Sequence, residues 1–381
     1  VIVHWAKTAD DFNNMVLDIL RQHGVKKMVK SKSMLTEECG MNPFLEQNGI
    51  DVVETDLGER ILQLLHQKPS HIVMPAIHLK REEVGRMFEE KGISKQMGNY
   101  DPTYLTRCAR QHLRQEFMEA GAGMTGCNFG VAKTGDIVVC TNEGNADMST
   151  SMPKLHLVAM GIEKIVPDYK SLAVFQRLLC RSATGQPTTA YTSHFRQARP
   201  GAEMHVILVD NGRSDILADP EHWETLKCIR CGSCMNTCPV YRRSGGYSYT
   251  YFIPGPIGIN LGMLRNPQQF ADNVSACTLC LSCDNVCPSK VGPGSQVYLW
   301  RQQLDSLHRA DRMKKMMSEG MELLFEHPHL YASTLKLAPL ANIIPDGMTH
   351  IRAINPWGVG HAMPEFAKES FQEMWKKGKI K

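Results

Sequence analysis

Residues 228–239, CIRCGSCMNTCP, decide how the second half of this chain folds. Three cysteines follow one another at two-residue gaps, and a fourth comes three residues later, directly before a proline. Residues 277–288, CTLCLSCDNVCP, repeat the same spacing. The two runs hold eight of the 13 cysteines, and an odd total clustered in this way does not fit a framework of disulfides. The spacing instead predicts metal sites built from thiolates.

The repeated spacing is typical of two [4Fe–4S] clusters. A cubane offers one iron at each corner, and each iron takes one thiolate, so that three closely spaced sulfurs surround one cube. The fourth cysteine, held by the following proline, ligates the other cube. We therefore expect one cluster on Cys228, Cys231, Cys234 and Cys287, and the other on Cys277, Cys280, Cys283 and Cys238. Structural zinc is the alternative, since CxxC pairs also bind zinc, but zinc gives no reason for duplicating the whole pattern.

The linker between the runs, residues 239–276, is long for a compact βαβ ferredoxin and favours a helical ferredoxin module. Residues 261–264 and 267–274 are the expected helical pieces, and residues 247–262, rich in Tyr, Gly and Pro, are expected to form a loop.

Residues 1–220 alternate helix and strand patterns, which is typical of an α/β domain with a largely parallel sheet. The expected helices are 10–22, 59–66, 82–91, 104–120 and 172–181. The expected strands are 27–29, 51–53, 71–74, 155–160 and 205–209, with a hairpin of 125–132 and 136–141 that turns at Lys133-Thr134-Gly135.

Three segments follow from these patterns: an α/β domain over 1–220, a helical ferredoxin domain with two clusters over 221–300, and a helical C-terminal extension over 301–381. In the extension, residues 298–323 have a helical pattern. Residues 364–377 are expected to form a last amphipathic helix with Phe366, Phe371 and Trp375 on its apolar side, ended by Gly378.

Composition and charge exclude several classes of protein. The 381 residues are 43% hydrophobic and 22% charged, which excludes a disordered chain or a collagen-like fibre. The net charge of +4 does not predict nucleic-acid binding. No apolar run is long enough for a transmembrane helix. Together with the cysteine pattern, this predicts a cytoplasmic protein, with attachment to a membrane through partners left open. The chain opens at Val1 without a methionine, so we expect further residues before it.

A polar stretch, TNEGN at 141–145, follows a predicted strand and is a candidate pocket at the carboxyl edge of the sheet, with an ordinary polar turn as the alternative. Lys154 and His156 alternate along the next strand and either face the same pocket or are satisfied elsewhere in the fold. The same two interpretations apply to residues 210–214, DNGRS.

Other patterns are weaker. GAGMTG at 121–126 matches GxGxxG, but a dinucleotide site needs a strand before the glycines and a helix after them, and here the order is reversed. The 15 histidines include no HExxH or other helix-spaced pair, so no catalytic zinc is expected. The remaining cysteines are expected to be buried free thiols: Cys39, Cys108, Cys127, Cys140 and Cys180.

Several segments together resemble the LutB-type family of lactate-utilisation iron–sulfur proteins. The matching segments are KSKSM at 30–34, VETDLG at 53–58, GCNF at 126–129, TNEGN at 141–145, MGIEKIVP at 160–167, DNGRS at 210–214, CIRC at 228–231 and CPVYR at 238–242. The resemblance implies an α/β LUD domain, similar to the NagB-type isomerases and CoA transferases, followed by an all-α two-cluster ferredoxin domain and a helical tail. Its relatives use a pocket at a strand edge, where Glu143 is the candidate catalytic residue.

The resemblance also implies a role in oxidising L-lactate to pyruvate, together with a cysteine-rich-domain iron–sulfur protein, a second LUD-domain protein and an external electron acceptor. The chain shows no hydride-carrier motif of its own. We therefore expect an electron-transfer subunit, non-catalytic or partly catalytic, of an L-lactate dehydrogenase complex. The alternatives are a redox-sensing scaffold and an enzyme that uses the Glu143 pocket.

Overall fold

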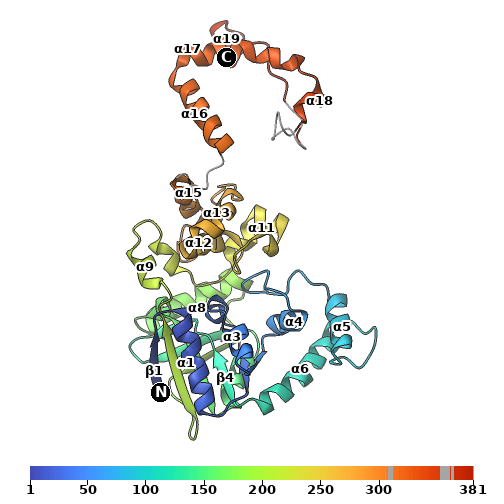
Figure 1. Cartoon of the computed structure of the whole chain (residues 1–381), viewed down its shortest axis with the longest axis vertical. Helices are drawn as coiled ribbons and strands as arrows, with labels where there is room; N and C mark the ends of the chain where they lie inside the picture. Colours follow the sequence, from blue (N-terminus) through green and yellow to red (C-terminus); the bar gives the residue numbers. More distant parts are fainter. Residues whose placement is uncertain (305, 308–311, 352–360, 362–363, 381) are drawn as a thin grey trace. The chain divides into compact units, whose positions relative to one another are not determined.

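The computed structural model describes residues 1–304, 306–307, 312–351, 361 and 364–380. The chain forms two compact units, Val1–Leu307 and His308–Lys381 (Figure 1).

A six-stranded parallel sheet is the centre of the first unit, in the strand order β1-β10-β7-β4-β2-β3. The strands are β1 (Ile2–Ala6), β2 (Lys27–Lys30), β3 (Asp51–Glu54), β4 (Ala122–Thr125), β7 (Leu155–Gly161) and β10 (Glu203–Val209). All residues of β7 are buried, as expected for a parallel sheet that is covered on both faces. The predicted strands at 27–29, 51–53, 155–160 and 205–209 are confirmed.

Helices cover one face of this sheet. They are α1 (Ala9–Gln22), α2 (Met34–Glu38) and α3 (Met41–Gln47). Phe12, Val16 and Leu20 recur at helical spacing along α1 and are fully buried against sheet residues such as Met124 and Leu157. Thr8 begins α1, since its hydroxyl accepts a hydrogen bond from the Asp11 N–H and Asp11 reciprocates.

The opposite face is covered by a helix and by a second sheet. Leu113 and Phe117 of α6 (Pro102–Glu119) pack on Val29 and Val53. The remaining helices that precede β4 are α4 (Leu57–Leu65) and α5 (Arg81–Glu90). The predicted helices at 10–22, 59–66, 82–91 and 104–120 are thus confirmed, with small shifts at their ends.

The second sheet has the strand order β8-β5-β6-β9. Its strands are β5 (Phe129–Val131), β6 (Asp136–Thr141), β8 (Ile165–Val166) and β9 (Tyr191–Phe195). The predicted hairpin is confirmed, since β5 and β6 are antiparallel and the Gly135 N–H donates to Val131 O across the turn. Residue 125 belongs instead to β4. This sheet packs between the main sheet and α8 (Tyr169–Thr184), which confirms the helix expected at 172–181.

Short elements complete the first 220 residues: α7 (Asn145–Ser151), the 3-10 turn η1 (Ile162–Lys164) and α9 (Arg213–Ala218). The glycines at 121–126 follow α6 and run into β4, so the order is helix then strand, as predicted. Gly123 allows α7 to approach β4, because a side chain there would lie 1.7 Å from Ser149 O.

Residues 221–304 contain helices and turns but no strand. The elements are η2 (Trp223–Lys227), α10 (Ser233–Thr237), α11 (Pro239–Ser244), η3 (Gly246–Ser248), α12 (Gly255–Arg265), α13 (Pro267–Ser275), α14 (Ser282–Val286) and α15 (Pro293–Gln303). Figure 1 shows α12 and α13 beside each other. The prediction of a loop over 247–262 is wrong for its second half, because α12 begins at Gly255. Pro256 favours the first turn of α12, and Ile257 and Ile259 are buried there.

The strand predicted at 71–74 is wrong, because these residues form an irregular loop. The loop is buried against the helical module instead of pairing in the sheet: Ile72 packs with Met235, Ile253 and Val291. The ring of His71 lies 3.1 Å from the Asn236 side chain, measured from Nε2 to Oδ1. The apolar pattern of residues 71–74 therefore predicted the burial of Ile72 correctly, but it predicted the wrong secondary structure.

The second unit is helical where it is described. Its elements are α16 (Arg312–Glu326), α17 (Pro328–Leu337), η4 (Ala338–Ile343), α18 (Asp346–Thr349) and α19 (Phe371–Lys376). The helix predicted at 298–323 corresponds to parts of α15 and α16, and residues 305 and 308–311 lie outside the described residues.

The helix predicted at 364–377 is wrong in its first half. Ser370 and Glu373 form a capping box that begins α19 at Phe371. Phe366 lies before the helix, while the rings of Phe371 and Trp375 stack within it. Among the helices that the structure describes, none combines the length and hydropathy needed to cross a bilayer.

Candidate functional site

The two cysteine runs adopt the same backbone conformation. Arg230 and Gly232 have φ values of 60° and 80°, and Leu279 and Leu281, at the equivalent positions of the second run, have 53° and 57°. Left-handed residues at two places in so short a loop turn successive backbone N–H groups towards its inside. The duplication therefore extends from the sequence spacing to the geometry of the loops.

Backbone N–H groups donate to the cysteine sulfurs in both runs. The Arg230 N–H donates to Cys228 Sγ at 3.4 Å, and the Leu279 N–H donates to Cys277 Sγ at the same distance. The cysteines before the prolines also accept: Cys238 Sγ from the Tyr241 N–H at 3.5 Å, and Cys287 Sγ from the Val291 N–H at 3.3 Å. Such hydrogen bonds stabilise negative charge on sulfur, as thiolate ligands require.

The structure brings each pre-proline cysteine to the opposite run. One small cavity is lined by Cys228, Cys231, Cys234 and Cys287, with apolar walls that include Ile72 and Ile257. Helices α10 and α14 contact each other between the runs, and the hydroxyls of Thr237 and Ser282 hydrogen-bond there.

The pKa values of the thiols reflect burial and the other cysteines nearby. Burial raises the pKa of Cys231, and the thiols of Cys228 and Cys287 raise it further. Burial raises the pKa of Cys283 to about 12, and Cys277 and Cys238 are among the neighbours that add to this rise. Burial also raises the pKa of the free thiol Cys127 to about 12, whereas hydrogen bonding lowers the pKa of Cys280, so these shifts reflect the depth of each thiol.

The two groups differ in their access to solvent. Cys231, Cys283 and Cys287 are buried, whereas Cys280 is exposed. Its neighbours Leu281 and Val286 are also exposed, at 43% and 41%. The group of Cys277, Cys280 and Cys283 therefore has one side at the molecular surface.

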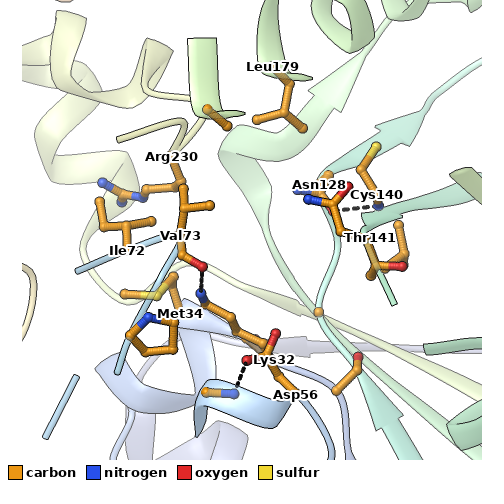
Figure 2. A pocket seen from close by; sticks show the side chains of 18 of the residues that line it. Lys32, Met34, Asp56, Ile72, Val73, Asn128, Cys140, Thr141, Leu179 and Arg230 are labelled. Carbon is orange, nitrogen blue, oxygen red and sulfur yellow. Dashed lines mark hydrogen bonds between the residues drawn. The ribbon is translucent and has the colours of Figure 1, made fainter. Parts of the chain in front are cut away.

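A cavity of about 670 Å³ lies at the carboxyl edge of the main sheet (Figure 2). Loops that follow four neighbouring strands line it: 31–33 after β2, 56–58 after β3, 126–128 after β4 and 161–164 after β7. Ile72 and Val73, from the loop that replaces the predicted strand, form part of its wall. Parallel strands end at the same edge, which is why these distant segments meet.

Polar groups of this cavity are held in place by the fold. Lys32 Nζ donates to Val73 O at 3.1 Å, and Asp56 Oδ1 accepts from the Gly58 N–H at the start of α4. Figure 2 shows Lys32 and Asp56 on one side and Asn128 on the other, where Asn128 Oδ1 accepts from the Cys140 N–H at 2.9 Å.

The large cavity and the first cysteine run share a wall. Ile229 and Arg230 line both the large cavity and the small cavity of Cys228, Cys231 and Cys234. Nη1 of Arg230 is buried and has no hydrogen-bond partner among the described residues. An unpaired guanidinium nitrogen in this wall is suited to an anionic group.

Glu143 lies at the rim of the large cavity, where its side chain remains accessible. The surrounding protein removes enough water to raise its pKa to about 7, and the Asp56 carboxylate contributes to the rise. A carboxyl group with such a pKa can exchange a proton near neutral pH.

Two residues considered with Glu143 do not join it. His156 is buried in the main sheet, where its Nε2 lies 2.9 Å from the Thr125 hydroxyl, so it is satisfied within the fold. Lys154 is exposed just before β7, and neither residue lines the cavity. In DNGRS, Asp210 caps α9 through the Ser214 N–H, and only Arg213 reaches the cavity.

Sequence reasoning missed the buried ion pairs at this end of the sheet, of which those of Arg213 line the cavity. Arg213 is buried between Glu38 and Glu163, with Nη2 3.0 Å from Glu38 Oε2. Lys30 Nζ, also buried, lies 2.6 Å from Glu54 Oε1. One feature of the sequence could have predicted the second pair. Lys30 and Glu54 are the last residues of two adjacent strands, so they end side by side.

Comparisons with known proteins agree with this architecture. Residues 1–216 match the family described as LUD domain, and residues 224–291 match the family described as 4Fe-4S dicluster domain. The chain is 39% identical to the uncharacterized electron transport protein YkgF of Escherichia coli, over 98% of this chain and 81% of that protein. It is also 39% identical to lactate utilization protein B of Shouchella clausii, with the same coverage. With lactate utilization protein B of Geobacillus thermodenitrificans the identity is 42%, over 89% of this chain and 72% of that protein.

Proposed function

Because the chain belongs to the LutB-type family, which joins a LUD domain to a 4Fe–4S dicluster domain, we propose that it is the electron-transfer subunit of an L-lactate-oxidising complex. The family and the dicluster domain support a role in lactate utilisation and electron transfer. Oxidation of lactate to pyruvate is the specific reaction that we propose.

We propose that two clusters are bound by exchanged ligands: Cys228, Cys231, Cys234 and Cys287 for the first, and Cys277, Cys280, Cys283 and Cys238 for the second. Bound iron–sulfur clusters supply reversible one-electron chemistry. The single observation that carries this proposal is the small cavity in which Cys287 lies with the thiols of the first run. This chain's own contribution is to hold the thiols, to donate N–H groups to them and to bury them wholly or partly, with Cys280 as the exposed member of the eight.

The positions of the two ligand groups suggest a route for electrons through the molecule. The first group shares the wall of Ile229 and Arg230 with the large cavity, and the second group has Cys280 at the surface. We propose that one partner exchanges electrons at the Cys280 surface, and that an anionic molecule in the large cavity would lie beside the first group. The proposed partners are a cysteine-rich-domain iron–sulfur protein, a second LUD-domain protein and an external acceptor.

The ligand exchange can be tested by comparing alanine variants in pairs. After anaerobic reduction, the electron paramagnetic resonance spectrum of Cys287→Ala should show the same damaged centre as Cys231→Ala, and Cys238→Ala should resemble Cys283→Ala. Cys108→Ala, which removes a free thiol in another core, is the matched control and should retain both centres. A Cys287→Ala spectrum that matches Cys283→Ala instead would contradict the exchange.

The role in lactate oxidation needs the assembled complex. Anaerobically purified protein should contain about eight irons, as two cubanes require. L-Lactate should reduce these clusters only when the partners are present. Lactate turnover by this chain alone would contradict a purely conducting role.

A second candidate function is an enzyme that uses the large cavity, and the position of Glu143 at the rim of that cavity, together with its raised pKa, favours it. In that case Glu143→Gln should abolish turnover of a molecule bound in the cavity while cluster reduction by dithionite continues. If Glu143→Gln leaves turnover unchanged, this candidate is excluded.

A further inference from the structure

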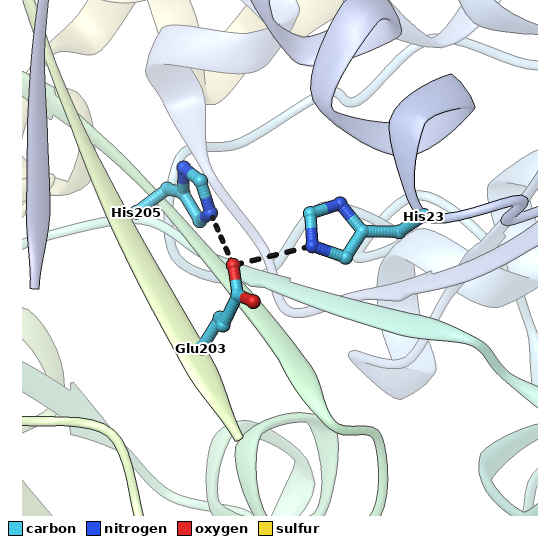
Figure 3. Close-up of side chains that lie close together, drawn as sticks. All are labelled: His23, Glu203 and His205. Carbon is cyan, nitrogen blue, oxygen red and sulfur yellow. Dashed lines mark hydrogen bonds and ion pairs between the residues drawn. The ribbon is translucent and has the colours of Figure 1, made fainter. Parts of the chain in front are cut away.

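A cluster of three side chains lies away from the cysteines and the large cavity (Figure 3). Glu203 begins β10 and His205 follows on the same strand, so both lie near the amino edge of the main sheet, opposite the cavity's edge. His23 comes from the C-terminal end of α1. The three ligand atoms all lie within 4.8 Å of one another. No sequence motif marks this cluster, because His23 and Glu203 are 180 positions apart.

The distances fit a tetrahedral zinc ion. Glu203 Oε2 is 3.2 Å from His23 Nε2 and 3.4 Å from His205 Nε2. Zinc bonds of about 2.0–2.1 Å to nitrogen and oxygen place neighbouring ligands of a tetrahedron roughly 3.3 Å apart. Both observed separations are close to this value, and the ligand atoms of His23 and His205 lie within 4.8 Å of each other.

Each histidine has a partner on its other ring nitrogen. His23 Nδ1 is 2.8 Å from Ile19 O, and His205 Nδ1 is 3.0 Å from Nε2 of His4. The His4 ring also stacks nearly parallel to the His205 ring, with 9° between the planes. Zinc-binding histidines commonly donate their second N–H to a carbonyl or similar acceptor, which orients the ring.

The two ring nitrogens of His23 have different partners, an arrangement compatible with a cation between His23 and Glu203. A neutral imidazole carries one N–H, but both nitrogens of His23 face oxygen acceptors: Ile19 O and Glu203 Oε2. An ion bound by Nε2 and Glu203 would leave the single N–H of the ring, on Nδ1, to donate to Ile19 O.

We propose that His23, Glu203 and His205 bind one Zn²⁺-type divalent cation, with the fourth position open to solvent. His23 and Glu203 are exposed, so the ion has access, and His205 is buried and fixed by His4. The ion would join the end of α1 to the start of β10. These two elements otherwise contact each other through packed side chains. This site is independent of the proposed electron transfer.

The test uses the full chain with its clusters intact, purified anaerobically, and Zn²⁺ alone as the probe. Equilibrium dialysis should find one zinc per chain, and zinc-edge X-ray absorption should show only nitrogen and oxygen ligands at about 2.0–2.1 Å. His23→Gln and Glu203→Gln should each weaken binding at least 100-fold. His4→Gln, which removes only the partner of His205, should weaken it by about 10- to 100-fold. His194→Gln, an exposed histidine on β9, is the control and should bind as the parent does.

Several outcomes would overturn the proposal. Sulfur in the zinc shell would assign the ion to cysteines. Unchanged affinity in His23→Gln would exclude this cluster, and no binding at micromolar zinc would show that the three side chains form only hydrogen bonds and ion pairs with one another. Because zinc that binds only the folded state stabilises it, a rise in melting temperature should appear in the parent and be absent in Glu203→Gln, which provides a second measurement.

Discussion

At the scale of single residues, His156 shows how burial changes the chemistry of one side chain. It lies within the main sheet against Thr125 and the ring of Phe195, and burial lowers its pKa to about 4. As the pH falls, His156 of the unfolded chain takes up a proton near pH 6.5, whereas in the folded protein it does so only near pH 4. Stability that is present above pH 6.5 is therefore lost as the pH falls towards 4.

We predict that the free energy of unfolding of His156→Gln falls less steeply than that of the parent as the pH drops from 6.5 to 4. Glutamine can keep a hydrogen bond to Thr125 but takes up no proton between pH 6.5 and 4. The parent should lose on the order of 3 kcal/mol over this range relative to the variant. Anaerobic urea unfolding at pH 8, 6 and 4.5 measures the difference. Parallel profiles for the two proteins would show that His156 is not responsible.

Equivalent positions of the two cysteine loops carry different residues in the same left-handed conformation. Gly232 has φ 80°, and Leu281 has φ 57°. A Cβ added at Gly232 would also lie 3.2 Å from the His71 ring, whereas Leu281 already carries its side chain at the surface. The backbone strain of the second loop is thus already present in the protein.

The difference between Gly232 and Leu281 predicts that alanine substitutions at the two positions lower the free energy of unfolding by different amounts. Gly232→Ala should destabilise the protein by about 1–2 kcal/mol, the cost of a left-handed non-glycine residue. Leu281→Ala, the matched control, adds no backbone strain and should change stability by less than about 0.5 kcal/mol. Urea midpoints of the cluster-loaded proteins test this, and equal midpoints would contradict it.

At the scale of elements, the loop between α4 and α5 joins the α/β part to the helical module. Besides Ile72, it offers backbone oxygens to two tyrosines of the module: Tyr241 donates to Ser70 O at 2.6 Å and Tyr247 to Lys68 O at 2.7 Å. Helix α8 contributes from the other side, since Leu179 packs in the same cluster as Ile229 and Cys231. The cysteine module is therefore held by irregular and helical segments together with the second sheet, since Phe129 and Val138 belong to the same cluster.

Two isoleucines of this loop give a matched pair. Ile72 is 4% exposed and Ile77 is 55% exposed. Ile72→Ala should cost about 2–5 kcal/mol, because it leaves a cavity beside Met235. It should also hasten cluster loss in air, measured as bleaching of the visible absorbance. Ile77→Ala should cost less than about 0.5 kcal/mol. Similar bleaching rates for both variants would argue against the role of Ile72.

At the scale of the whole molecule, the compact unit Val1–Leu307 contains both the main sheet and every clustered cysteine. The boundary expected between residues 220 and 221 stays a prediction, as does the likeness of the first domain to isomerases and CoA transferases. The helices of the second unit that the structure describes carry exposed apolar side chains, such as Met317 and Phe325 at 59% and 64%.

We predict that a chain ending at Leu307 keeps its iron. All proposed ligands and the residues lining the large cavity belong to the first unit. Iron and sulfide per chain, and the reduced spectrum, should equal those of the full chain. A loss of half or more of the iron would show that the last residues are needed to form or retain the clusters.

Local patterns determined much of the fold by themselves. Cysteine spacing predicted the iron–sulfur module, because ligands of one loop must lie within a few residues of one another. Periodicity predicted α1, β7 and β10, because one buried face repeats at a fixed interval along the chain. Tertiary structure alone decided that residues 71–74 pack on the module, that loops from four strands form one cavity, and that His23 meets Glu203 and His205. The physical reason is that an apolar or polar pattern records that a residue is buried or charged, while only the folded chain determines which distant residue lies against it.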